Sequence, residues 1–353
     1  MPPDSPSPAT FPPRVGAPAR ALNRARLLWS YWRKEEISRG IPLAMHIEIT
    51  NRCNLDCPMC LRDAYPQEER DMEMSLFLRM LNEIGPWLDL AALYGRGEPL
   101  LCPTLFPMIR ECHRRRIAVK LCTNGTLLDE AMSEAILREG VSHVNIGIDG
   151  NSPEVYARYR KGGSFAAVIE NVERFLRMKI KLRARTWVAI QMIRMAGTEP
   201  ETEAFLARWK RVPGANVVRV KEDEVKVDGY DLHFLPPRTP DSPCLFPWLG
   251  PMEVKADGSY HFHGWADQCL AVNAYDTGVI DAWNGPEYIA WRRAHLANAL
   301  APYDWCARCL APKPRWILTP VAFLANQDWV AKQVGRIEGV AMGPLKRLHM
   351  FVR

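Results

Sequence analysis

The 353-residue sequence contains no apolar run near the roughly 20 residues that a membrane-spanning helix needs. The nearest candidate, residues 316–325, is short and interrupted by Pro320. The N-terminus lacks the basic and then apolar pattern of a secretory signal peptide, so we expect a cytoplasmic protein without a transmembrane segment. The sequence also lacks a large net charge. The excess of 46 basic over 40 acidic side chains is only +6, which is too weak to indicate a nucleic-acid-binding protein.

The apolar share of 48% is ample for a core, and the length corresponds to roughly two domains. The first residues are rich in proline and serine and predict a disordered leader. A short basic helix follows within residues 1–40. Such a helix most commonly packs onto the main domain, and peripheral contact with a membrane or a partner is the alternative.

An alternation of strands and helices begins at residue 44 and predicts an α/β fold. Six units are fewer than the eight of a complete barrel, so we expect a partial (β/α)6 TIM-like barrel over 41–228, with function at the carboxyl ends of its strands. The expected strands are 44–50, 88–94, 117–122, 143–148, 182–193 and 216–220, and the expected helices are 75–84 with Ser75 as its cap, 104–115, 128–139, 165–178 and 200–210.

The alternation stops near residue 228. A boundary at 228–240 separates the barrel from a small cysteine-rich domain over 229–316, with a hairpin around 256–258 and a helix near 286–299. The basic tail, 317–353, is expected to be helical.

Three cysteines form the strongest motif in the sequence. Cys53, Cys57 and Cys60 make a C-x3-C-x2-C loop directly after the first strand. Three thiolates on one loop can hold three irons of a [4Fe–4S] cluster and leave the fourth iron without a protein ligand. A zinc site is the alternative, but it would need a fourth ligand, and the nearest candidate, His46, lies inside the strand. Three other cysteines, at positions 102, 112 and 122, stand apart and are expected to pack in the core.

The strand leading into this loop, in a partial barrel, resembles the radical SAM superfamily. The resemblance implies that the free iron binds S-adenosylmethionine (SAM), and that reductive cleavage of SAM yields a 5′-deoxyadenosyl radical that removes a hydrogen atom from substrate. A flavodoxin- or ferredoxin-type reductant is implied as the electron donor.

Further stretches carry the same resemblance and imply SAM contacts. Gly95-Arg96-Gly97-Glu98-Pro99 resembles the family's glycine-glycine-glutamate-proline motif, in which glycines admit a ligand and a carboxylate accepts from an ammonium group. The sequence departs from the pattern at Met59, where an aromatic residue is common, and at Gly147, where serine is common. The remaining implied contacts are Asn124, Asp149, Gln191 and Arg194; for the last two, simple solvation of a strand end is an equal alternative.

A second cysteine group resembles the auxiliary-cluster module called SPASM, in its shorter twitch form, because only four cysteines are available. They are Cys244, Cys269, Cys306 and Cys309, and the resemblance implies one auxiliary [4Fe–4S] cluster. His263 is the alternative to Cys269 as a ligand, because histidine also ligates iron–sulfur iron. If His263 is the ligand, Cys269 could donate a hydrogen atom to a substrate radical. Zinc is the alternative for this group too.

The sequence therefore indicates a radical SAM enzyme with one auxiliary cluster. We expect a small polar substrate, such as a sugar, an aminocyclitol or a nucleoside, that is oxidised, epimerised, dehydrated or joined by a carbon–carbon bond. Two alternatives stay open: a maturase of ribosomal peptides with a recognition partner in trans, and a non-catalytic zinc- or cluster-binding scaffold.

Overall fold

A computed structural model of the chain describes residues 14–60, 62, 68–222, 243–262 and 268–308. The proline-rich leader up to residue 13, the expected boundary at 228–240, the tail, His263 and Cys309 lie outside these residues. Statements about the structure refer to the described part.

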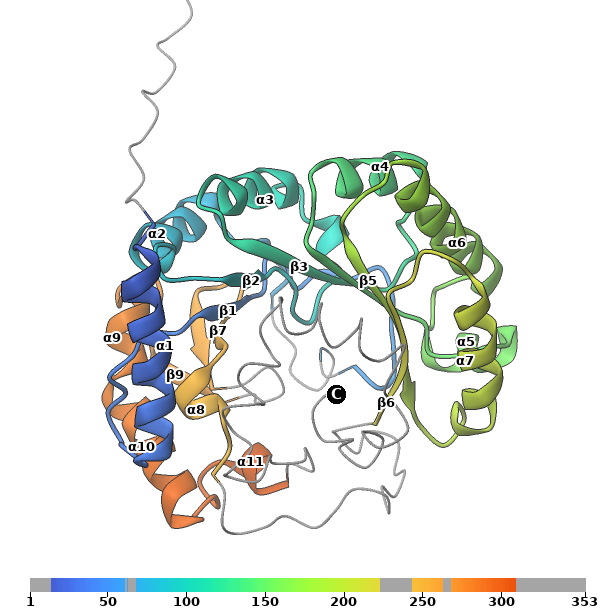
Figure 1. The fold of residues 1–353 in the computed structure, drawn as a ribbon. Coiled ribbons are helices and arrows are strands. Elements are labelled where there is room, and N and C mark those ends of the chain that lie inside the picture. Colours follow the sequence, from blue (N-terminus) through green and yellow to red (C-terminus); the bar gives the residue numbers. More distant parts are fainter. Residues whose placement is uncertain (1–13, 61, 63–67, 223–242, 263–267, 309–353) are drawn as a thin grey trace, which may run out of the picture.

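A single nine-stranded sheet forms the centre of the fold, in the order β6-β5-β4-β3-β2-β1-β7-β8-β9. Its first six strands are all parallel and follow one another in chain order, which confirms the expected partial barrel. Figure 1 shows the sheet curving with its helices on the outer side. These strands are β1 Ala44–Ile47, β2 Leu90–Ala92, β3 Ala118–Thr123, β4 His143–Gly147, β5 Trp187–Arg194 and β6 Val217–Glu222.

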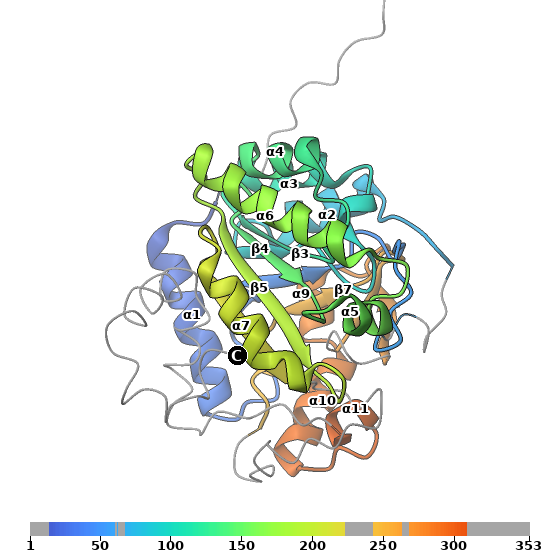
Figure 2. The same ribbon diagram turned by 90° about the vertical axis from the view of Figure 1, so that its right-hand side faces the viewer.

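The helices between the parallel strands cover the outer face of the sheet, as the view turned by 90° also shows (Figure 2), and further helices precede and follow them. Their order along the chain is α1 Ala17–Trp32, α2 Met74–Ile84, η1 Pro99–Leu101, α3 Leu105–Arg114, α4 Glu130–Arg138, α5 Pro153–Tyr159, α6 Phe165–Lys181, η2 Glu199–Glu201, α7 Thr202–Arg211, α8 Phe246–Leu249, α9 Val279–Trp283, α10 Pro286–Ala297 and α11 Asp304–Arg308. None of these helices has the length and the apolar content to cross a membrane.

Two local expectations need revision. The prediction of Ser75 as the cap of α2 is wrong: the helix begins one residue earlier, and the Ser75 hydroxyl bonds the Glu73 carboxylate instead. The helix α5, between β4 and α6, was not predicted. Ser152 caps it by accepting from the backbone N–H of Val155, and Pro153 occupies its first turn.

The strands after residue 243 extend the barrel sheet. β7 (Met252–Val254) pairs in parallel with β1, and the antiparallel β8 (Ser259–His261) and β9 (Cys269–Asn273) follow it. The hairpin expected around 256–258 is therefore confirmed, as is the helix expected near 286–299. The first strand of the cysteine-rich segment is nevertheless a direct neighbour of the first barrel strand.

The strands alternate between an apolar outer face and a more polar concave face. In β3, Val119 and Leu121 are fully buried, whereas Lys120 and Cys122 between them are half-buried. The expectation that all three isolated cysteines pack in the core is thus met by Cys102 and Cys112 only. Cys122 belongs to the concave face of the sheet, where the polar residues described below gather.

Candidate active site

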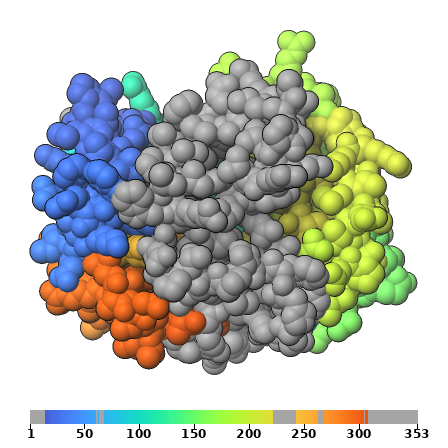
Figure 3. All heavy atoms as spheres, turned by 60° about the horizontal axis from the view of Figure 1, so that its bottom comes forward, coloured from blue at the N-terminus to red at the C-terminus, as the bar shows by residue number. Residues whose placement is uncertain are grey.

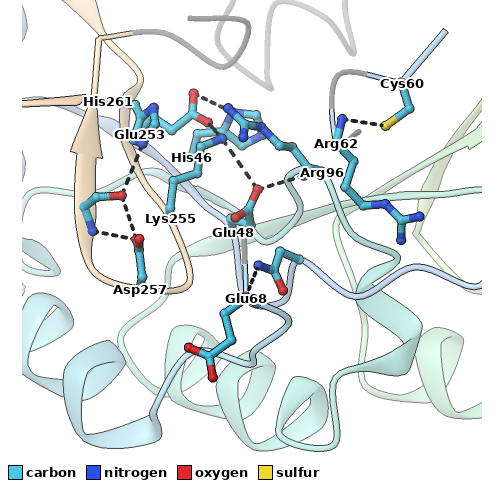
Figure 4. Close-up of polar contacts among 12 residues, drawn as sticks. His46, Glu48, Cys60, Arg62, Glu68, Arg96, Glu253, Lys255, Asp257 and His261 are labelled. Carbon is cyan, nitrogen blue, oxygen red and sulfur yellow. Dashed lines mark hydrogen bonds and ion pairs between the residues drawn. The ribbon is translucent and has the colours of Figure 1, made fainter. Parts of the chain in front are cut away.

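The cysteine loop leaves β1 at the carboxyl edge of the sheet, and polar groups donate to its sulfurs. Arg160 Nη1 lies 3.9 Å from Cys57 Sγ, and Asn124 Nδ2 lies 4.0 Å from Cys53 Sγ. The backbone N–H of Arg62 donates to Cys60 Sγ at 3.5 Å (Figure 4). Hydrogen bonds to the sulfurs are a feature of iron–sulfur sites, where they tune the cluster.

Burial is the main influence on the ionisation of the cysteine loop. Burial raises the pKa of the Cys57 thiol to about 11 and also raises the pKa of Cys53. Cys57 is close enough to feel the charge of Cys53 and Cys60, and Cys53 that of Cys60. Without a metal, they are therefore protonated at neutral pH, and a bound cluster would displace their protons. The donor set and its surroundings fit a [4Fe–4S] cluster.

The glycine-rich turn after β2 packs directly on the cysteine loop. A Cβ on Gly97 would collide with the carbonyl oxygens of Thr50 and Arg52, so only glycine allows this close approach. The backbone N–H of Glu98 donates to the Arg52 carbonyl at 2.8 Å. The two motifs that the sequence analysis joined by resemblance are thus in contact.

Glu98 also connects this turn to the end of β3. It is 2% exposed, and its Oε2 accepts from the backbone N–H of Asn124 at 2.8 Å, while Oε1 accepts from that of Leu100 at 3.2 Å. Burial raises the pKa of Glu98, which these bonds partly oppose. Each carboxylate oxygen has two lone pairs, so the side chain retains capacity for a ligand donor.

Hydrogen bonds of the Asn124 side chain orient it toward the cysteine loop. Its Nδ2 donates to Asn54 Oδ1 at 3.0 Å, and its Oδ1 accepts from the backbone N–H and hydroxyl of Thr126. Asn124 therefore braces the loop from the neighbouring strand end.

Asp149, at the end of β4, acts on the same loop through Arg160. Asp149 is fully buried, with Oδ2 at 2.6 Å from Arg160 Nη2 and Oδ1 accepting from the Ile193 N–H at 2.7 Å. The Arg160 guanidinium bridges this carboxylate to Cys57 Sγ. The sequence analysis gave Arg160 no role. Its signal was a charged residue between α5 and the Gly162-Gly163 pair.

Arg160 also explains the departure at Gly147. A Cβ at this position would lie 2.6 Å from Arg160 Nη2. The space that a serine side chain would occupy is thus filled by the guanidinium.

The other predicted SAM contacts lie at the same edge of the sheet but in separate surroundings. Gln191 Oε1 accepts from Arg219 Nη2 on β6 at 2.8 Å, and Arg194 forms an ion pair with Glu199 at 3.8 Å. Met59 is half-buried within the cysteine loop.

A buried charge network lines the concave face between β1 and β7 (Figure 4). Lys255 Nζ bonds Glu253 Oε1 and lies 3.5 Å from Glu48 Oε2, and all three residues are at most 2% exposed. Glu48 Oε2 accepts from the backbone N–H of Arg96 at 2.8 Å, while Glu253 Oε2 lies 3.7 Å from His46 Nδ1. The network thus connects the glycine-rich turn to β7.

Charge pairing sets the ionisation of this network. Burial would raise the pKa of Glu253, but Lys255 and His46 hold it well below its usual range, and the two carboxylates raise the pKa of Lys255. The sequence analysis missed Glu48, Glu253 and Lys255, and it considered His46 only as a zinc ligand. Their signal was alternation, because His46 and Glu48, like Glu253 and Lys255, stand two positions apart in otherwise apolar strands.

The second cysteine group is only partly described. Cys269 is exposed at the start of β9, opposite His261 of β8, and Cys306 Sγ accepts from Trp291 Nε1 at 3.4 Å. Cys244 is half-buried before α8. Over the described residues, no three histidine, cysteine, aspartate or glutamate side chains are grouped to hold a single metal ion. A [4Fe–4S] cluster asks for a different arrangement, because each iron takes its own ligand.

Comparison with known proteins identifies the barrel. Residues 47–201 match the model of the radical SAM superfamily, and this range includes the cysteine loop, the glycine-rich turn and Asp149. These residues form a radical SAM domain. The enzymes of this superfamily use a [4Fe–4S] cluster and SAM, as predicted from the sequence.

Three relatives give the radical SAM domain its context. The chain is 38% identical over 107 residues to the tungsten-containing aldehyde ferredoxin oxidoreductase cofactor-modifying protein of Pyrococcus furiosus, a match covering 30% of each chain. It is 24% identical to the PqqA peptide cyclase of Ruegeria pomeroyi over 72% of this chain and 79% of that protein. The crystal structure of Streptococcus suis SuiB bound to S-adenosylmethionine superposes with a TM-score of 0.55 and 14% identity, over 79% of this chain and 74% of SuiB, which supports the fold.

Proposed function

We propose that this radical SAM enzyme removes a hydrogen atom from a peptide substrate. Cys53, Cys57 and Cys60 hold the SAM-binding cluster, and the turn Gly95–Glu98 receives the amino group of SAM. The observation that carries the cluster assignment is the set of donors from Asn124, Arg160 and the Arg62 backbone around the three sulfurs. When bound, the cluster and SAM supply the hydrogen-abstracting radical, and a flavodoxin- or ferredoxin-type protein supplies the electron.

The residues of the chain orient and insulate these groups. Arg160 keeps a positive charge beside Cys57, because Asp149 holds the guanidinium in place. Glu98 and Asn124 fix the glycine-rich turn against the cysteine loop. Met59, Gln191 and Arg194 complete the SAM contacts in this proposal, with Met59 as an apolar surface for adenine.

The four cysteines of the C-terminal segment would hold one auxiliary [4Fe–4S] cluster that conducts an electron or helps to bind substrate. Cys269 is retained as the fourth ligand by the count of thiols, with His263 as the alternative. About eight irons per chain are then expected, four for each cluster.

The choice of a peptide rests on a relative whose match covers most of both chains. The match to PqqA peptide cyclase spans most of both chains and extends beyond the radical SAM domain. The small polar substrate expected from the sequence is the second candidate, favoured by the higher identity to the cofactor-modifying protein, although that match spans a smaller part of the chain.

Transfer of a labelled hydrogen atom from substrate to the 5′-deoxyadenosyl radical, detected in the product 5′-deoxyadenosine, tests the reaction and the substrate class together. The chain, purified without oxygen and reconstituted with iron and sulfide, should form 5′-deoxyadenosine from SAM and a strong reductant, and Cys57→Ala should abolish this product. Deuterated cell extract, separated by size into peptides and small molecules, is then added, and the mass of 5′-deoxyadenosine is measured.

We expect 5′-deoxyadenosine to gain deuterium when the peptide fraction is added. Deuterium from the small-molecule fraction alone would establish the second candidate. Formation of 5′-deoxyadenosine by the Cys57→Ala variant, or a chain that binds zinc without sulfide, would contradict the radical SAM assignment and leave the scaffold alternative.

A further inference from the structure

Only one face of the helix α1 packs on the protein. Its inner face is formed by Asn23, Leu27, Ser30 and Tyr31, which are all at most 3% exposed. Tyr31 donates its hydroxyl proton to the Pro243 carbonyl at 2.8 Å, and its ring meets that of Trp248. This contact is the packing onto the main domain that the sequence predicts, and it leaves the opposite face outside.

That outer face is apolar where a surface helix is normally polar. Six large hydrophobic side chains are exposed in the described part of the chain, and four of them lie between residues 22 and 37. Leu22, Trp29 and Trp32 follow one side of α1 with Pro18 and Ala25, at spacings of three and four residues. The exposed fractions are 51%, 45% and 51%, and Ile37 beyond the helix adds 60%.

The helix that carries this stripe has positive charges only, and the two acidic residues that follow it, Glu35 and Glu36, are paired with Arg39 and Arg293. Residues 14–34 contain five arginines and one lysine and no acidic residue. Arg26 and Arg33 are exposed beside the stripe, and the Arg33 guanidinium lies 6.0 Å from the centre of the Trp29 ring. Figure 3 shows this blue N-terminal segment as an outer flank of the molecule.

The inner arginines leave a positive excess as well. Arg14, Arg20 and Arg24 all pair with the single carboxylate of Asp89. Burial, and then the neighbouring Arg14 and Arg24, lower the pKa of Arg20 to about 10. Further anions near α1 would relieve this repulsion.

We infer that the outer face of α1, from Leu22 to Ile37, is a docking surface for an anionic lipid bilayer. Tryptophans insert at the level of the headgroups, and flanking arginines reach the lipid phosphates while their stems cover apolar surface. The combination of two exposed tryptophans with a helix whose charged residues are all basic matches such an interface. An acidic segment of a partner protein has the same charge, but it does not require aromatic residues of this kind.

Binding of the full chain to vesicles tests this inference independently of the cluster. The chain is mixed at low salt with vesicles of equimolar phosphatidylcholine and phosphatidylglycerol and sedimented. We expect it to sediment with these vesicles and not with phosphatidylcholine alone, and to be released by high salt. The double variant Trp29→Ser/Trp32→Ser should bind at least about tenfold more weakly, because the apolar burial at the headgroups is lost.

Matched variants distinguish binding through this surface from non-specific hydrophobic binding to vesicles. Ile180→Ser/Tyr275→Ser removes exposed apolar side chains elsewhere and should bind like the wild type, whereas Arg26→Glu/Arg33→Glu should lose binding. Failure of the wild type to bind would overturn the inference, as would equal binding to neutral vesicles or unchanged binding by the double tryptophan variant. Binding of a polyglutamate peptide in place of vesicles would also overturn it and point to a protein partner.

Discussion

At the scale of single residues, Arg160 has the greatest influence on the proposed site. Its guanidinium joins the buried Asp149 carboxylate to Cys57 Sγ, and it occupies the space beside Gly147. Burial opposes the charge, but Asp149 and Cys57 raise the pKa of Arg160, so it remains a cation. The glycine at 147, a departure from the family pattern in the sequence, is a consequence of this arrangement.

The contact between Gly147 and Arg160 predicts a non-additive pair of substitutions. Gly147→Ala should destabilise the chain by about 1–3 kcal/mol, because the new methyl group displaces the guanidinium. In an Arg160→Ala background the same change should cost much less, because the space is empty. Urea unfolding of the four proteins, with matched iron content, measures the coupling. Equal costs in both backgrounds would show that Arg160 does not set the residue at 147.

Arg160→Ala should also slow the formation of 5′-deoxyadenosine by about 10- to 100-fold, since groups that support metal ligands typically have effects of this size. Glu154→Ala, a change at an exposed position of the neighbouring helix α5, is the control and should be neutral.

At the scale of elements, the sequence predicted strands and helices better than their ends and connections. The six parallel strands were found by their apolar runs, because the outer face of each strand is buried under helices. The helix α5 was missed because its seven residues are too short to show a clear period. Ser75 was mistaken for a cap because a serine near a helix start is common, and the backbone decides which residue is the N-cap.

The packing of α6 on the end of the sheet depends on a partly buried lysine. Lys179 Nζ donates to the Gly214 carbonyl at 2.6 Å and to Asn216 Oδ1 at 2.5 Å, and Asn216 precedes β6. Burial lowers the pKa of Lys179 to about 8, from a usual 10.5. The folded chain therefore releases this proton at lower pH than the unfolded chain does.

The pKa of Lys179 predicts a rise of stability with pH. Between about pH 8 and 10.5 the unfolded chain binds more protons at this side chain than the folded chain, so the free energy of unfolding increases with pH from this group. Raised thiols such as Cys57 act in the opposite direction. The difference in urea midpoint between wild type and Lys179→Met isolates the lysine and should grow in favour of the wild type over this range. A difference that stays constant with pH would contradict the lowered pKa.

At the scale of the whole molecule, the sequence predicted the barrel and the cysteine motifs but not how the C-terminal segment joins them. Cysteine spacing and glycine-rich turns are local signals, so they are readable in one sequence. The pairing of β7 with β1 is a contact between residues about two hundred positions apart, and no local pattern encodes it. The charges at Glu48, Glu253 and Lys255 were visible, but their mutual neutralisation depends on that pairing.

This long-range pairing makes Lys255, the buried lysine directly after β7, important for the integrity of the whole sheet. Lys255→Met should destabilise the chain by about 3–5 kcal/mol, because Glu48 and Glu253 would remain as buried carboxylates without a cation. Adding Glu253→Gln to Lys255→Met should recover part of that loss, since one of the two stranded charges is then removed. Lys221→Met, a lysine on a half-buried position of β6, is the control for general loss of a lysine and should cost less. Urea unfolding midpoints at matched iron content measure these differences in stability. A double variant no more stable than Lys255→Met would show that the loss of stability comes from packing and not from unpaired charge.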